Sequence, residues 1–343
     1  MEQSNIIGNI TISEVQRNEK TSVRRAKLKD TAAEKVILFL TVMSALMIVF
    51  IFIFIIQKSI TVFRVNGLGF VTKTGFDQQI SDSILALPED QTWVFGVFGL
   101  LTGSVLTTLG ALLIALPMGI GTAVVISELS PVWTRKFLQS IVRLLAAIPS
   151  ILFGLIGMLV VIPFIQKTFV TTGLQLKYIQ FFQMDGKSLL TGILVLSLMI
   201  LPIIVALSVD AINAVPKKYK EASLALGLSN WRTIVKVILP SAKSGILAGT
   251  VLGMGRAMGE AIALSMVSGG VGNIPNPAHG PGFLLTPVLT LASAIVNKSE
   301  AMSTPPIQSA LFGCGVVLLV TTTLLSISTR VVEYVVKRRQ GFV

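Results

Sequence analysis

The chain has 343 residues, of which 52% are hydrophobic and 13% are charged, and its mean hydropathy is +0.81. Soluble globular domains usually carry about 25% charged residues, so the composition excludes a soluble fold and indicates a polytopic membrane protein. The formal net charge of +12 is compatible with nucleic-acid binding or with a Lys and Arg excess on the cytoplasmic side of a membrane.

One cysteine and one histidine, Cys314 and His279, exclude an internal disulfide framework and a metal centre built from several thiolate or imidazole ligands. We therefore expect no metal and no cofactor in this chain. The polar N-terminal segment and the long apolar run after it also differ from a cleavable signal peptide.

Six apolar stretches with few charges predict an all-α protein with six transmembrane helices, since one crossing needs about 20 apolar residues. The stretches comprise residues 36–57, 91–127, 144–166, 188–209, 244–271 and 301–329. The second stretch is too long for one straight crossing, and Pro117 predicts a kink in it. Residues 283–296 are apolar but short, which predicts a re-entrant or interfacial segment.

Six crossings place both termini on the same side of the membrane. Twenty of the 28 Lys and Arg residues fall on that side, seven fall on the other side, and Arg256 lies inside a predicted span. Because cytoplasmic loops carry the excess of Lys and Arg, both termini are predicted to be cytoplasmic. The positive net charge is then explained by the orientation of the chain in the membrane, and we expect no nucleic-acid partner.

The same pattern predicts the organisation of the chain. We expect a cytoplasmic tail that is flexible or an interfacial helix, a first transmembrane helix, a long polar outer loop, a transmembrane domain and a short cytoplasmic tail. These parts comprise residues 1–35, 36–57, 58–93, 94–333 and 334–343.

Residues 216–240 predict a helical hairpin on the cytoplasmic side. Pro216 suits the first turn of a helix, and Gly227 stands where the C-terminal cap of that helix would lie. Ser229 can cap a second helix, which Pro240 would close. The residues alone leave two interpretations open: an amphipathic hairpin on the bilayer surface, or a docking element for a cytoplasmic partner.

A motif in this hairpin resembles the EAA loop of bacterial ABC importer permeases. Glu221-Ala222-Ser223, then Gly227, then Val237-Ile238-Leu239-Pro240 keep the spacing of that loop, with Ser223 and Val237 as departures from its usual residues. The resemblance implies the type-1 ABC importer permease fold and a hairpin that couples the membrane helices to a separate ATP-binding subunit. The implied coupling residues are Glu221, Ala222, Ser223, Gly227, Trp231, Leu239 and Pro240.

The chain itself carries no ATP-binding motif. Its Gly186-Lys187-Ser188 has Phe181 where a P-loop requires a glycine to cradle phosphate groups. Asp210 is a lone acid at a span boundary and His279 lies in an outer loop rich in Gly and Pro, so an intramembrane protease is disfavoured. We therefore expect a transport subunit, not an enzyme, with ATP hydrolysis on another polypeptide.

Glycines recur in the fifth predicted span. Gly245, Gly249 and Gly253 follow one another at intervals of four residues, and Gly255 and Gly259 form a second pair. Such spacing allows helices to pack closely in lipid. We expect Gly249, Gly253, Gly255 and Gly259 to serve helix packing.

The same span contains Arg256 and Glu260, four residues apart. A central Arg costs roughly 2.5–3.5 kcal/mol on membrane-insertion scales, and a shared helix face would let the two charges partly neutralise each other. One interpretation is a structural ion pair. The other is an anion pathway, in which the planar guanidinium of Arg256 binds an oxyanion and Glu260 positions Arg256 or accepts a hydrogen bond from a protonated anion.

The segment Gly255-Arg256-Ala257-Met258-Gly259-Glu260 resembles the signature of phosphate importer permeases of the PstC type, although Ala261 stands where that family usually has Thr. The resemblance implies inorganic phosphate as the substrate, with Arg256 and Glu260 in its pathway. It also implies a bacterial or archaeal plasma membrane, a second permease subunit of the PstA type, two copies of an ATP-binding subunit and an outer phosphate-binding protein. Another oxyanion, such as sulfate or molybdate, and an ATP-independent anion transporter or channel remain alternatives.

Overall fold

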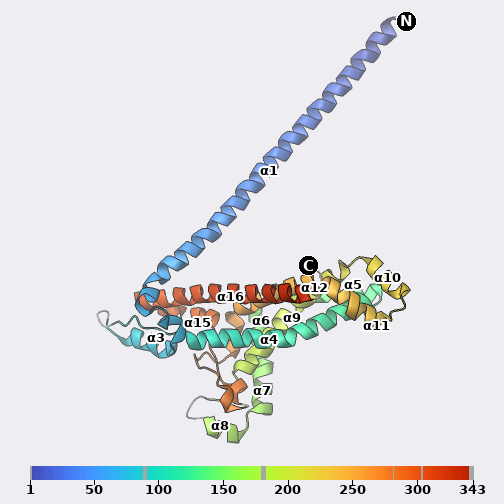
Figure 1. The fold of residues 1–343 in the computed structure, drawn as a ribbon. Helices are drawn as coiled ribbons and strands as arrows, with labels where there is room; N and C mark the ends of the chain where they lie inside the picture. The colour runs from blue at the N-terminus through green and yellow to red at the C-terminus, as the bar shows by residue number, and fades with distance from the viewer. Residues whose placement is uncertain (1, 88–90, 179–182, 281, 303, 340–343) are drawn as a thin grey trace. The chain divides into compact units, whose positions relative to one another are not determined.

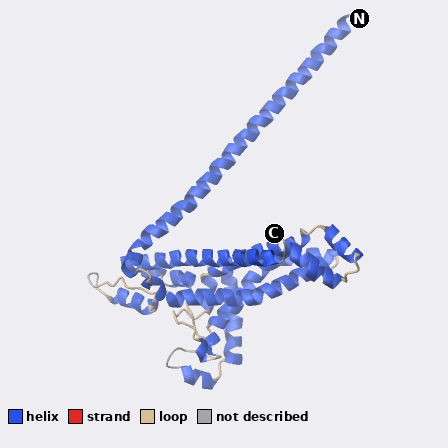
Figure 2. Cartoon of the chain, viewed as in Figure 1, coloured by secondary structure: helices blue, strands red, loops and turns tan. Residues whose placement is uncertain are grey.

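The structure is a computed structural model that describes residues 2–87, 91–178, 183–280, 282–302 and 304–339. The regular structure in these ranges is helical, with an isolated bridge between Gly269 and Val288 (Figure 2). Within the described ranges, six helical segments are long and apolar enough to cross a membrane, and the predicted all-α class is confirmed. The chain divides into two compact units, Met1–Gln57 and Lys58–Val343.

The first unit consists of helix α1, which covers Glu2–Asn66 and so extends into the second unit. Its candidate membrane span is Ala33–Asn66, longer than the stretch predicted from the sequence. Apolar side chains from Val36 to Phe54 are exposed, which is typical of a helix surface that faces lipid. The N-terminal tail, predicted to be flexible or interfacial, is the first part of this helix.

The long polar connection predicted for residues 58–93 is largely folded. Helices α2 (Gly69–Thr72) and α3 (Phe76–Leu85) follow α1, and Phe70, Phe76 and Ile80 are buried in a core that also contains residues of α16. The sequence prediction described this segment by its polar residues and made no statement about its fold. The few apolar side chains decide its structure by packing on the ends of the membrane helices.

Asp77 connects α3 to two segments that are distant in the sequence. Its Oδ2 accepts a hydrogen bond from the amide of Gly272 (2.6 Å), and its Oδ1 lies 3.3 Å from Nζ of Lys298. Gly272 belongs to the loop that follows α13, and Lys298 follows α15. The outer loop rich in Gly and Pro is therefore held in place by a carboxylate from the segment that precedes the core helices.

Four long helices form the centre of the second unit. They are α4 (Phe98–Val124), α9 (Leu189–Asn213), α12 (Leu239–Met258) and α16 (Pro305–Arg339). Helix α9 packs against both α4 and α12, and two thirds of its candidate span is buried. Pro117 lies inside α4, which continues past it and ends in the π-helical turn η1 (Val125–Leu129).

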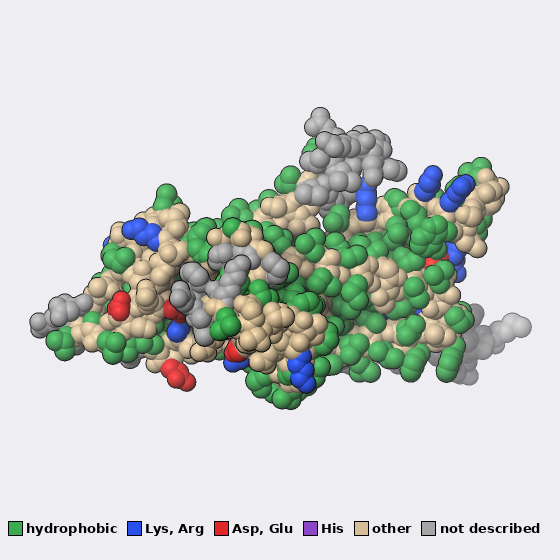
Figure 3. Space-filling model, turned by 90° about the horizontal axis from the view of Figure 1, so that it is seen from below, with side chains coloured by type: hydrophobic (Ala, Val, Ile, Leu, Met, Phe, Trp, Pro, Cys, Tyr) green, Lys and Arg blue, Asp and Glu red, His purple; other side chains and the backbone are tan. Residues whose placement is uncertain are grey.

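Shorter helices surround these four. They are α5 (Val132–Ala146), α6 (Ser150–Ile156), η2 (Gly157–Val161), α7 (Ile162–Phe169), α8 (Thr172–Tyr178), α10 (Lys217–Ala225), α11 (Asn230–Thr233), η3 (Ile234–Ile238), α13 (Ile262–Val267), η4 (Pro277–His279), α14 (Gly282–Leu285), α15 (Leu291–Asn297) and η5 (Ser299–Ala301). In Figure 1, α10 and α11 lie at one end of the second unit, and α3 and α15 lie at the other end. The face in Figure 3 carries many hydrophobic side chains between its ends, and charged side chains gather toward those ends.

The short apolar segment at residues 283–296 forms α14 and α15, joined by an extended stretch. Val288, Leu289 and Leu291 in and beside this stretch are fully buried. The amide of Leu291 donates to Oγ of Ser104 on α4 (2.8 Å), and Thr290 caps α15 through Ser293. Irregular backbone inside a membrane protein is tolerated where protein surrounds it, and this segment meets that condition.

Helix α4 packs so closely on the outer loop that Gly99 has no room for a side chain. A Cβ added at Gly99 would clash with the carbonyl oxygen of Gly272, whereas a Cβ at Gly121 on the same helix would meet nothing within 4 Å. We predict that Gly99→Ala lowers the melting temperature of the purified protein, since overpacking costs about 1–3 kcal/mol. Gly121→Ala, the matched control, should leave it equal or higher. Equal melting temperatures for the two variants would contradict this packing.

Candidate functional site

The fifth predicted span is broken in the middle of its charged motif. Helix α12 ends at Met258 and α13 begins at Ile262, so Gly259, Glu260 and Ala261 form the connection. The amide of Glu260 donates to the carbonyl of Ala257 (3.3 Å), a spacing of three residues that closes the last helical turn. Glycine is a poor helix former, so Gly259 weakens the helix where the break occurs.

The carboxylate of Glu260 is buried in this break and bonds to the backbone. Glu260 is 8% exposed, and its Oε1 accepts a hydrogen bond from the amide of Ala263 (3.0 Å). A carboxylate in this position satisfies one of the free N–H groups at the start of α13. Glu260 therefore fixes the turn between the two helices.

The structural ion pair between Arg256 and Glu260, one of the two interpretations of the sequence, is not formed. Neither residue belongs to an ion pair in the part of the chain that the structure describes. The prediction assumed a continuous helix, in which positions four apart share a face. The break at Gly259 removes Glu260 from that register, and the half-buried Arg256 remains without a carboxylate partner in the described residues.

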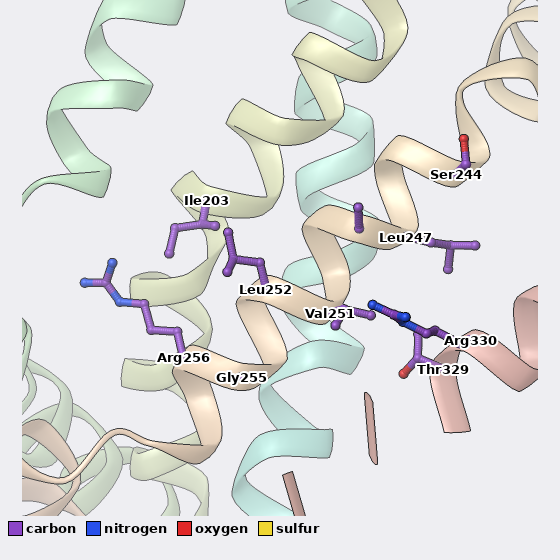
Figure 4. A pocket seen from close by; sticks show the side chains of 10 residues that line it. Ile203, Ser244, Leu247, Val251, Leu252, Gly255, Arg256, Thr329 and Arg330 are labelled. Atoms are coloured by element: carbon purple, nitrogen blue, oxygen red, sulfur yellow. The ribbon is translucent and has the colours of Figure 1, made fainter. Parts of the chain in front are cut away.

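Arg256 lines an open cavity of about 1020 Å³ between α9, α12 and α16. The lining residues are Ile203, Ser244, Leu247, Ala248, Val251, Leu252, Gly255, Arg256, Thr329 and Arg330. In Figure 4, Arg256 lies at one end of this row, and Ser244 and Arg330 lie toward the other. The guanidinium of Arg256 points away from Arg330. The cavity is thus apolar along its middle and cationic at both ends.

The glycines of α12 divide into two groups. A Cβ at Gly249 would lie 2.9 Å from Cβ of Leu207, and one at Gly253 would lie 3.2 Å from Cγ1 of Ile204, so both glycines face α9. Gly255 lines the cavity, and an added Cβ there would meet nothing within 4 Å. The nearest atoms at Gly259 belong to the same helix. Gly255 and Gly259 therefore meet no neighbouring helix among the described residues, and their role in helix packing stays a prediction.

The predicted helical hairpin is present and has the predicted caps. Gly227 ends the first helix at φ +81°, a backbone conformation that favours glycine. Oγ of Ser229 accepts from the amide of Arg232 at the start of the second helix. Inside the hairpin, Oγ of the buried Ser223 donates to Oγ1 of Thr233 (3.0 Å).

Pro240 does not close the second helix of the hairpin. Helix α11 passes through η3 directly into α12, and Pro240 lies at the second position of α12. The candidate span accordingly runs without interruption over Asn230–Met258. The prediction was wrong because the η3 turn carries the chain across the proline. The second arm of the hairpin and the helix that carries Arg256 therefore form one continuous helical segment, which we call the continuous rod.

The coupling residues named from the motif occupy different positions in this hairpin. Glu221, Ala222, Gly227 and Trp231 are exposed, and Trp231 is 63% exposed. Ser223 is buried inside the hairpin, and Leu239 and Pro240 are half-buried at the start of α12. An exposed tryptophan beside exposed small residues is typical of a surface that another protein covers.

Residues 115–340 match the family model described as the binding-protein-dependent transport system inner membrane component. The chain belongs to this family. The permease is therefore a multi-pass inner membrane protein and a membrane transport subunit.

Two curated relatives support this assignment over most of their length. The "Probable ABC transporter permease protein YqgH" of Bacillus subtilis (strain 168) is 35% identical over 291 residues, or 84% of each chain. The phosphate transport system permease protein PstC of Pasteurella multocida (strain Pm70) is 34% identical over 252 residues, or 71% of this chain and 77% of that protein.

A solved structure shares the fold of the permease. It is a bacterial alginate ABC transporter in complex with an alginate pentasaccharide-bound periplasmic protein, and it matches with a TM-score of 0.50 at 16% sequence identity. The match covers 85% of this chain and 92% of that chain. The predicted type-1 ABC importer permease fold is confirmed.

One contact of the hairpin was missed by the sequence analysis. Nζ of Lys220 on α10 binds Oε2 of Glu128 on η1, at the end of α4. The Glu128 side chain is 12% exposed and that of Lys220 is 41% exposed, so the carboxylate is largely removed from water. The available signal was the position of Glu128 as the first charge after the long apolar run, opposite a hairpin rich in Lys.

We predict that this ion pair stabilises the hairpin on α4. Glu128→Lys and Lys220→Glu should each lower the melting temperature, because a buried polar group without its partner costs about 1–3 kcal/mol. The double variant restores opposite charges and should recover most of the loss. As a control, Arg143→Gln removes the exposed pair of Arg143 with Asp210 and should have little effect. A double variant as unstable as the sum of the singles would refute the prediction.

Proposed function

We propose that the permease translocates inorganic phosphate as the membrane subunit of an ATP-driven importer, with both termini in the cytoplasm. The observation that carries the proposal is Arg256, a half-buried cation that lines the cavity between α9, α12 and α16 and has no carboxylate partner among the described residues. Several relatives at 31–34% identity are named phosphate transport system permease proteins, which supports phosphate over other oxyanions.

A guanidinium in a transport pathway suits phosphate for a physical reason. It presents donors in a planar fork that matches two oxygens of a tetrahedral oxyanion, and it is always charged. Replacing a buried ion pair by apolar residues is often neutral or stabilising, so stability alone explains an intramembrane Arg poorly. Glu260 acts in this proposal as a positioning residue, because its hydrogen bond to Ala263 holds the turn that follows Arg256.

The proposed importer includes further subunits. A second permease of the PstA type pairs with this chain, two copies of an ATP-binding subunit contact the hairpins, and an outer binding protein delivers phosphate. Movement of the hairpin reaches Arg256 through the continuous rod Asn230–Met258. Arg256 thereby becomes accessible from one side of the membrane and then from the other.

We predict that Arg256→Gln reduces phosphate uptake by at least about tenfold, because a hydrogen bond to a charged group contributes about 1.5–3 kcal/mol. Arg256→Lys should give an intermediate rate, since it keeps the charge and loses the fork. The measurement is radiolabelled phosphate uptake in cells that lack other phosphate importers, with sulfate and molybdate as competitors. Normal uptake by Arg256→Gln at equal membrane abundance would overturn the proposal, and inhibition by sulfate rather than by phosphate would reassign the substrate.

We also predict that Gly227→Val weakens binding of the ATP-binding subunit. A Cβ at position 227 would meet no atom within 4 Å, so the effect of the variant comes from the strain of a β-branched residue at φ +81°. The turn between α10 and α11 should then open. The measurement is the amount of ATP-binding subunit that co-purifies with the tagged permease. Gly121→Val, at an equally open glycine of α4 outside the hairpin, should retain the wild-type amount. Equal recovery for both variants would count against the proposed role of the hairpin.

A further inference from the structure

The cavity that contains Arg256 has a second polar end. There, Ser244 of α12 and Thr329 and Arg330 of α16 contribute two hydroxyl groups and a guanidinium. In Figure 4 the Arg330 side chain extends from α16 toward Val251, so it lies over the lining of the cavity. These three residues belong to neither the hairpin nor the motif around Arg256.

The cavity carries two positive charges and no acidic lining residue. Its lining includes Arg256 and Arg330, and neither forms an ion pair in the described part of the chain. Other cations on the predicted cytoplasmic side do find carboxylates, as Arg143 does with Asp210 and Lys220 does with Glu128. The field in the cavity therefore favours an anion.

The two cationic ends are separated along α12. From Ser244 to Arg256 the helix advances by about 18 Å, at about 1.5 Å per residue. The lining between them consists of apolar side chains and small residues, with Leu247, Val251 and Leu252 among them. An anion that leaves Arg256 meets no further donor on these side chains until it reaches the other end.

We propose that Ser244, Thr329 and Arg330 form a second oxyanion site, which receives the transported anion from Arg256 before its release into the cytoplasm. The inference rests on the proposed function and deepens it. A pathway that binds its ion at two successive sites can bind it firmly enough to admit it and weakly enough to let it leave. The Ser244 hydroxyl can donate to a phosphate oxygen while the guanidinium compensates the charge. The Thr329 hydroxyl donates to the carbonyl of Leu325 (3.0 Å) and has to rotate away from it to bind the anion.

The test uses the complete importer in proteoliposomes, with its binding protein and ATP, and measures the initial rate of phosphate entry. We expect Arg330→Gln to lower the rate about tenfold, as loss of a charged hydrogen bond predicts. Arg330→Lys should keep most of the rate, because it keeps the positive charge. Stimulation of ATP hydrolysis by the loaded binding protein should persist in both variants, since the hairpin is untouched. Lys136→Gln is the matched control, as it removes an exposed cation of α5 outside the cavity lining.

A rate for Arg330→Gln equal to that of Lys136→Gln would overturn the second site. Arg330 could also serve to anchor α16 at the membrane surface, in which case Arg330→Gln would insert poorly. The uncharged double variant Ser244→Ala with Thr329→Val separates these roles, and it should lower the rate about threefold at normal membrane abundance. An unchanged rate in this double variant would likewise overturn the site. Absence of phosphate entry with the wild-type importer would instead refute the proposed function.

Discussion

The close contact between α12 and α9 determines how the cavity that contains Arg256 is arranged. Gly249 and Gly253 lie against Leu207 and Ile204, so the backbone of α12 approaches α9 without intervening side chains. This contact fixes the rotation of α12 about its own axis. A neighbouring face of the helix, from Ser244 to Arg256, then lines the cavity. A larger residue in the glycine row would separate the helices and move that face.

The same helix connects the cavity to the hairpin. Because α11, η3 and α12 are continuous over Asn230–Met258, a displacement of the hairpin can be transmitted along a rigid rod. The other arm of the hairpin, α10, is attached to the end of α4 through Lys220 and Glu128. Helix α4 reaches the outer loop at Gly99. The hairpin therefore contacts α4 through an ion pair and continues into α12 through the backbone.

The break after Met258 gives Arg256 its chemical character. In a continuous helix, Glu260 would lie beside Arg256 and compensate its charge. In the structure Glu260 accepts a hydrogen bond from the amide of Ala263, and Arg256 has no carboxylate partner among the described residues. The cost of a half-buried, unpaired cation is offset where the cavity admits water or an anion. Together with Arg330, this arrangement gives the cavity lining two positive charges and no acidic side chain.

The sequence by itself determined the membrane class, the six spans, the caps of the hairpin at Gly227 and Ser229, and the family, because each depends on local composition or on a contiguous motif. Only the tertiary structure decided the break between Arg256 and Glu260, the passage of α11 through Pro240 into α12, the burial of the segment around Asp77 and the contact of Glu128 with Lys220. The hydrophobic periodicity of a sequence describes each helix as continuous and without neighbouring helices. Breaks, and pairs of residues distant in sequence, depend on which neighbours pack against the chain, and that information lies in no single segment.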